Sequence, residues 1–207
     1  MRLRSWMAAI GVALLIAPAL AQLGFAASNP AEYVGNIEQR AIRIIGNAEL
    51  SPAARRQEFT AAVSRTFDLP AIARFTLGRY WDVATPRQRR RFLGALDAYM
   101  VNVYWERLQH LQQYPGAWLK VVRERPIGAR TTLVATRLQL PSGHPPVDLD
   151  WTVVRRKGRY EILDLSIDNV NQALAERAQF GDLITRYGGS LPALIALMRA
   201  ETSQVTG

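Results

Sequence analysis

The chain has 207 residues, a formal net charge of +9 at pH 7 and no cysteine, and 49% of its residues are hydrophobic. This composition is typical of a globular protein, and the lack of cysteine excludes a disulfide framework, a thiolate metal site and a cysteine nucleophile. The only two histidines, His110 and His144, leave little material for a metal site.

Residues 1–21 are predicted to be a cleaved secretory signal peptide. Two arginines precede an apolar stretch without acidic residues at 6–20, and residues 19–21 form a small-x-small cleavage pattern. A cut after Ala26 is one alternative. A transmembrane anchor is another, although the apolar stretch is shorter than the ~20 residues that span a bilayer. Export argues against a nucleic-acid partner, despite the basic charge.

Helices are predicted wherever a capping side chain precedes a proline. Asn29, Ser51 and Thr85 each stand directly before a proline, so each can cap a helix that begins at that proline. Thr85 also has a glutamine three residues later, the spacing of a capping box. A short helix is expected after Asp68, and the longest helix is expected over residues 86–112. The first half of the chain is therefore expected to be helical.

Four arginines at the start of the longest helix oppose the helix dipole. They are Arg87, Arg89, Arg90 and Arg91. A solvated face explains them, and a surface that attracts an anionic partner is the alternative.

The spacing of apolar residues changes from helical to alternating after residue 116. Strands are expected over residues 118–125, 130–140, 147–153 and 160–167, and a turn at Lys157-Gly158 predicts consecutive antiparallel pairing. Two helices follow, over residues 170–187 and 191–199, separated by two glycines. Helices, then a meander of strands, then helices indicate an α+β fold with a four-stranded antiparallel sheet.

No residue pattern for catalysis is evident. The chain has neither a glycine-rich phosphate loop nor a Gly-x-Ser-x-Gly motif. Asp148 and Asp150 share a strand face beside arginines, where solvation is expected. Asp164 falls on the same alternation as Ile162, which predicts a carboxylate near the apolar face. A helix cap or an arginine partner is favoured for Asp164 over an acid–base role.

Residues 67–81, which read FDLPAIARFTLGRYW, and residues 84–89 resemble the MlaC (toluene-tolerance) family of periplasmic phospholipid-binding proteins. The resemblance resumes at residues 145–151 and 160–164 and covers about residues 31–199. It implies one lipid-binding domain over residues 28–202, followed by a short tail at 203–207. One departure is local, since the sequence Asp-Asn-Val-Asn follows the last strand where relatives typically read Glu-Gly-Val-Ser. A hopanoid-biosynthesis-associated branch is similar across the same motifs.

The resemblance implies a periplasmic carrier that holds phospholipid acyl chains in an apolar cavity enclosed by the sheet and helices. Such a carrier moves lipid between an outer-membrane lipoprotein complex and an inner-membrane ABC transporter complex, and so maintains outer-membrane lipid asymmetry. An acyl chain of ~15 methylenes costs on the order of 10 kcal/mol to expose to water, so lipid needs a carrier to cross an aqueous gap. This task requires no cofactor, metal or catalytic residue. The alternatives are a hopanoid-linked carrier, a lipid-free envelope adaptor, and an enzyme with Asp164 as general base.

Six residues are predicted to contact the lipid tails because they share the apolar faces of the strands and of the longest helix. They are Leu149, Trp151, Val153, Ile162, Tyr99 and Val103. For each of them, packing in a filled core is the alternative.

Overall fold

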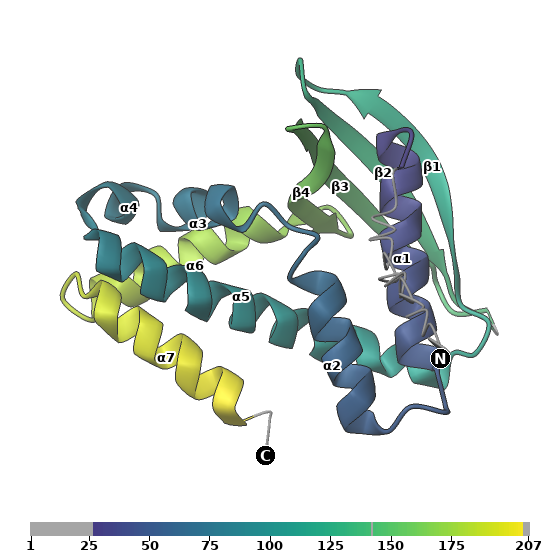
Figure 1. The fold of residues 1–207 in the computed structure, drawn as a ribbon, viewed down its shortest axis with the longest axis horizontal. Helices are drawn as coiled ribbons and strands as arrows, with labels where there is room; N and C mark the ends of the chain where they lie inside the picture. The colour runs from purple at the N-terminus through teal and green to yellow at the C-terminus, as the bar shows by residue number, and fades with distance from the viewer. Residues whose placement is uncertain (1–26, 142, 205–207) are drawn as a thin grey trace, which may run out of the picture.

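The computed structural model describes residues 27–141 and 143–204, and its elements follow the expected order of helices, strands and helices (Figure 1). The predicted signal peptide, with its alternative cut after Ala26, lies outside the described residues. In chain order the elements are α1 (Pro30–Gly46), α2 (Pro52–Val63), α3 (Leu69–Leu77), α4 (Arg79–Val83), α5 (Pro86–Gln109), the 3-10 helix η1 (His110–Gln113), β1 (Trp118–Pro126), β2 (Thr131–Gln139), β3 (Val147–Arg156), β4 (Arg159–Ile167), β5 (Val170–Asn171), α6 (Gln172–Arg186) and α7 (Leu191–Gln204).

The predicted capping residues begin the helices of the first half. Asn29, Ser51, Asp68 and Thr85 each accept a hydrogen bond from the backbone N–H three residues later. At Thr85 the capping box is complete, because the Gln88 side chain accepts from the Thr85 N–H at 2.8 Å. These side chains satisfy N–H groups that the first turn of a helix leaves without a partner. The starts of four helices are thus confirmed.

The sheet has the order β1-β2-β3-β4-β5 with antiparallel neighbours, so the prediction of four strands is wrong by one. The chain reverses after β4 through Asp168 and Asn169, whose φ angles are 48° and 67°. Two successive left-handed residues form a tight hairpin turn, and Asp and Asn tolerate this conformation better than most residues. The two residues of β5 therefore pair with β4 where a helix was expected, and α6 begins at Gln172.

The residues that depart from the family sequence suit the turn that they form. Asn169 stands where relatives have glycine, and its positive φ is one that asparagine can adopt. Asn171 stands where relatives have serine, and its side chain caps α6 by accepting from the Leu174 N–H at 2.8 Å. Both residues therefore fit the local structure that places α6.

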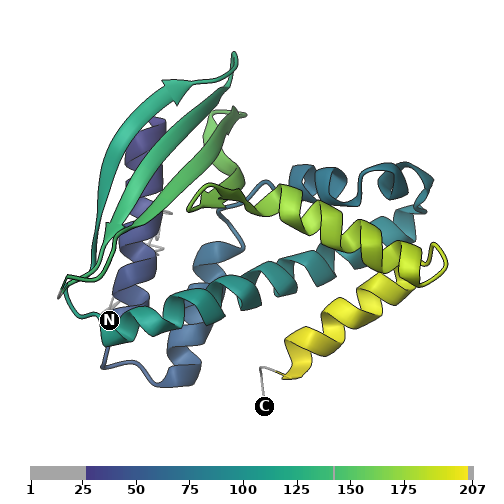
Figure 2. The ribbon, with the colours of Figure 1, turned by 180° about the vertical axis from the view of Figure 1, so that it is seen from behind.

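One helix covers a face of the sheet, and most of the others lie beyond β4. α1 lies across one face, packed on β1 and β2, while α3 and α6 reach the sheet at β4 (Figures 1 and 2). α5 packs against α7 in a helical layer beyond β4. None of the helices within residues 27–204 is both long and apolar enough to cross a bilayer.

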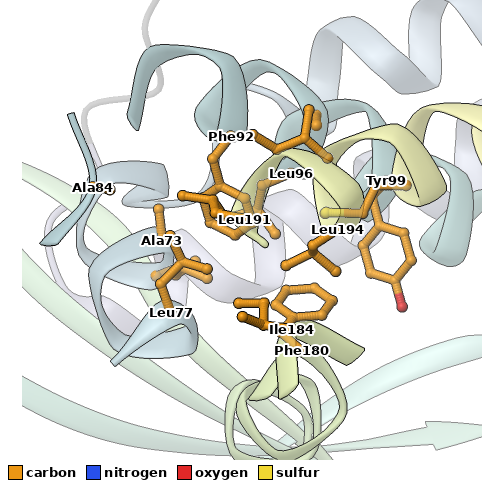
Figure 3. Close-up of a cluster of buried hydrophobic side chains, with 14 residues drawn as sticks. Ala73, Leu77, Ala84, Phe92, Leu96, Tyr99, Phe180, Ile184, Leu191 and Leu194 are labelled. Carbon is orange, nitrogen blue, oxygen red and sulfur yellow. The ribbon is translucent and has the colours of Figure 1, made fainter. Parts of the chain in front are cut away.

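Two large clusters of buried apolar side chains follow from this arrangement. The helical cluster joins α3, α5, α6 and α7 and is drawn in Figure 3; among its fully buried members are Phe92, Leu96, Phe180, Ile184 and Leu194. The sheet cluster lies between α1 and the sheet and consists of Val34, Val134, Trp151, Val153, Ile162 and Leu165. A third, smaller cluster joins α1, α2 and α5.

Candidate functional site

A cavity lies where the helical layer meets β4. Its walls come from α3, α5, β4 and α6, and most of the lining is apolar. The apolar lining residues are Phe67, Ile72, Leu96, Tyr99, Met100, Val103, Tyr104, Leu163, Leu165 and Ala173. The cavity volume is about 40 Å³, which is room for a few water molecules at roughly 10–15 Å³ each.

Polar and charged side chains also line this cavity, among them Arg107, Asp164, Gln172 and Glu176. Arg107 near the end of α5 donates to Gln172 at the start of α6 at 2.6 Å, and Arg107 is exposed, so the cavity reaches the surface there. Tyr99 donates to both carboxylate oxygens of Glu176 at 3.1 Å. Burial raises the pKa of Glu176 and of Tyr99, and the hydrogen bond between them offsets part of this effect at the carboxylate. The cavity is thus an apolar slot with one wet, charged end.

The six predicted residues fall into two groups. Tyr99 and Val103 line the cavity. The other four belong to or pack against the sheet cluster under α1, namely Leu149, Trp151, Val153 and Ile162. Both groups were expected to share one space, and Phe67, Tyr104 and Leu165 belong both to the cavity lining and to the sheet cluster or its neighbours. Whether any of the six contacts lipid stays a prediction.

An aromatic pair stands between the two groups. Phe67 and Tyr104 stack with ring centroids 5.4 Å apart and an interplanar angle of 7°. Both line the cavity, and both also pack against the sheet cluster. The backbone of residues 66–68 is held on β4 by hydrogen bonds of 2.9 Å on either side of Ile162. Sequence analysis missed this pair, because its partners lie on elements that meet only in the tertiary structure.

Asp164 does not lie on the face predicted for it. A β-bulge between β3 and β4 inserts one residue after Ile162, so that Ile162 pairs with Val153 but Asp164 pairs with Thr152. The extra residue moves Asp164 to the face opposite Ile162. There it accepts from the Ala173 N–H at 3.0 Å and from the Asn171 side chain.

These contacts make Asp164 a capping residue for α6. Burial raises its pKa, and the hydrogen bonds from Ala173 and the neighbouring groups partly offset the shift. The helix cap expected for Asp164 is confirmed. The solvation expected for Asp148 takes the form of an exposed ion pair, with Arg137 Nε 2.5 Å from its carboxylate.

Glu38 is a buried carboxylate that sequence analysis missed. It lies on α1 and is 4% exposed, and its Oε1 accepts from Thr136 Oγ1 at 2.6 Å and from Trp151 Nε1 at 2.8 Å. Its Oε2 has no hydrogen-bond partner among the described residues. Burial raises its pKa to about 7. The available signal was its position four residues after Val34, on the apolar stripe of α1.

The arginines at the start of α5 divide into different roles. Arg89 makes contacts within the protein. Its guanidinium donates to the Trp81 and Asp82 carbonyl oxygens at 3.0 and 3.2 Å and lies over the Trp81 ring. Arg91 faces α7, where it lines a groove of about 210 Å³ together with Arg199. Arg89 therefore fits neither expected role, and an anionic partner for Arg91 stays a prediction.

No group of three or more His, Asp or Glu side chains within the described part of the chain is placed to hold a metal ion. The residues that line the cavity offer an apolar surface, the cation of Arg107, and the carboxyl groups of Asp164 and Glu176. Such a lining suits an amphiphile.

Comparison with known proteins agrees with this architecture. The fold is similar to that of a phospholipid-binding protein from Ralstonia solanacearum, solved in complex with a phospholipid, with a TM-score of 0.73 over 87% of this chain and 100% of that chain. The two sequences are 18% identical, so this likeness shows the fold alone. The model of the MlaC protein family matches residues 36–200, from α1 into α7. Because this match spans most of the sequence and includes every wall of the cavity, the chain belongs to the MlaC family.

Proposed function

We propose that this protein is a periplasmic phospholipid carrier that holds acyl chains between the helical layer and the sheet. The observation that carries the proposal is the apolar cavity between α3, α5, α6 and β4, with Arg107 at its wet end. In this arrangement tails enter the slot and the head group stays in water near a cation. Family membership supports transfer between an outer-membrane lipoprotein complex and an inner-membrane ABC transporter complex as the purpose.

The carrier state requires the cavity to widen. A chain of ~15 methylenes is far larger than a space for a few water molecules, so the walls must separate when lipid enters. The stacked rings of Phe67 and Tyr104 are the partition whose movement joins the cavity to the sheet cluster. In the joined space the six predicted residues, Leu149, Trp151, Val153, Ile162, Tyr99 and Val103, line one slot.

The first experiment is mass spectrometry of the organic extract from natively purified mature protein. Diacyl phospholipid in about equal amount to protein is the expected result, and a hopanoid would assign the protein to the alternative branch. A lipid-free adaptor is the second candidate, favoured by the small cavity volume of about 40 Å³. Protein that carries no lipid and takes none from vesicles would establish the adaptor and reject the carrier.

A substitution in the cavity tests the site itself. Val103 lines the cavity and is half-buried, whereas Val153 is 1% exposed, so a bulky residue is better tolerated at position 103. Val103→Trp should lower bound phospholipid about tenfold, because excluding two methylenes forfeits about 1.6 kcal/mol. The same substitution at Val83, which is 79% exposed, is the matched control. Equal lipid content in both variants, with normal circular dichroism, would remove Val103 from the site.

A further inference from the structure

β1 is an edge strand of the sheet, and one of its faces points away from α1. On the neighbouring strand β2, Val134 packs with Val34 of α1 and Thr136 donates to Glu38 of α1, so these two positions face the helix. Residues of β1 that pair with the intervening positions of β2 therefore lie on the outer face. With the extra residue of the bulge, they form what we call the β1 strip: Trp118, Lys120, Val122, Arg123 and Arg125.

The β1 strip is exposed and carries charge of one sign. Trp118 is 54% exposed and Val122 is 52% exposed, two of the most exposed large apolar side chains in the described structure. Lys120, Arg123 and Arg125 take part in none of the ion pairs among the described residues. Glu124, the acidic residue of β1, pairs with Val134 and so lies on the opposite face. Figure 2 shows β1 and β2 in front of α1, with no described helix over their outer face.

We propose that the β1 strip is a docking surface for an anionic phospholipid bilayer. Cations on one face of an extended strand can approach anionic head groups together, and each contributes about fivefold to the affinity. Tryptophan is favoured at the level of the head groups, where its ring is half in water, so Trp118 adds an apolar contact at one end of the row of charges. This inference rests on the proposed function, because it identifies the surface through which the lipid carrier binds a membrane.

Charge complementarity favours a bilayer over a second copy of the chain. Two β1 edges that paired with each other would bring their cations together, and the bulge after Val121 interrupts the row of backbone groups that pairing requires. A bilayer rich in phosphatidylglycerol presents the opposite charge. Salt should therefore weaken the attraction.

The test is flotation of natively purified mature protein with vesicles of phosphatidylcholine, with and without phosphatidylglycerol. Neutralising the strip in the triple variant Lys120→Gln, Arg123→Gln, Arg125→Gln should lower affinity for phosphatidylglycerol vesicles about one hundredfold, at about fivefold per cation. The matched control, Arg43→Gln, Arg65→Gln, Arg186→Gln, removes three exposed cations elsewhere and has the same net charge. This control variant should lose much less affinity for phosphatidylglycerol vesicles than the strip variant.

A second measurement follows Trp118 directly. Vesicles should shift the tryptophan fluorescence of the protein to shorter wavelength, and this shift should vanish in Trp118→Ala, because the other tryptophans within the described residues are buried or half-buried. Equal flotation of the strip variant and its control, or equal flotation without phosphatidylglycerol, would overturn the proposal. So would a wild-type dimer in sedimentation that the strip variant abolishes, since that result assigns the surface to a second copy.

These outcomes are separate from those of the proposed function. Lipid in the cavity is measured on the strip variant by mass spectrometry of its organic extract. Normal lipid content with lost flotation supports both proposals, whereas an empty cavity with normal flotation rejects only lipid carriage.

Discussion

Glu38 is expected to make the stability of the protein fall as the pH rises. Its side chain is 4% exposed beneath α1, and its Oε2 has no hydrogen-bond partner among the described residues. Burial raises the pKa of Glu38 from its ordinary value of 4.5 to about 7, and the hydrogen bonds from Thr136 and Trp151 offset only part of that rise. The folded protein therefore holds a proton that the unfolded chain releases.

The direction and the size of the pH effect on the free energy of unfolding follow from this difference in pKa. Between pH 4.5 and about 7 the folded state binds more protons than the unfolded state, so the free energy of unfolding falls with rising pH in this window. Below the window Glu38 is protonated in both states, and above it ionised in both, so its contribution is then constant. At ~1.4 kcal/mol per pH unit the full loss is about 3 kcal/mol.

Glu38→Gln removes the charge and keeps an oxygen that accepts from Thr136 and Trp151. The variant should match the wild type within about 1 kcal/mol near pH 5 and exceed its free energy of unfolding by about 2–3 kcal/mol near pH 8. Urea unfolding followed by circular dichroism across this range measures both curves. Glu58→Gln, at an exposed position on α2, is the control, and its free energy of unfolding should change with pH as that of the wild type does. Parallel curves for wild type and Glu38→Gln would refute the argument from burial.

Two further predictions concern local structure, and urea unfolding measures both. Arg89→Ala should lower the free energy of unfolding by about 1–2 kcal/mol, because it removes hydrogen bonds to two carbonyl oxygens at the end of α4. Arg87→Ala, at an exposed neighbouring position, should change it by less than about 0.5 kcal/mol; equal effects would contradict the role given to Arg89. Asn169→Gly should be neutral within about 0.5 kcal/mol, whereas Asn169→Val should cost about 2 kcal/mol, because a β-branched residue strains the left-handed turn. A tolerated valine would show that the turn can adopt another conformation.

Helix starts and strand faces were predictable because their signals are local. A capping side chain, a proline and the spacing of apolar residues lie within a few positions of the element that they define. Asn29, Ser51, Asp68 and Thr85 cap helices in the structure as expected. The two-residue strand β5 is too short to show a period, so its residues were assigned to the following helix.

The candidate site was predicted only in part, since its assembly depends on contacts between distant segments. Tyr99 and Val103 were identified from their spacing on α5, and both line the cavity. The partition formed by Phe67 and Tyr104 joins residues from different elements, so no window of sequence contains it. Alternation gave the wrong face for Asp164, because one inserted residue in β4 reverses the side of every residue after it.

The sequence by itself determined the order of the elements, most of their ends, the antiparallel meander and the family resemblance. The tertiary structure alone decided which apolar faces meet, where the cavity lies, that Glu38 is buried, and which arginines form no ion pair with another described residue. The physical reason is the separation along the chain over which each kind of interaction acts. Caps, turns and periodicity act between near neighbours, whereas burial, bulge position and the pairing of side chains across elements are set by how whole helices pack on the sheet.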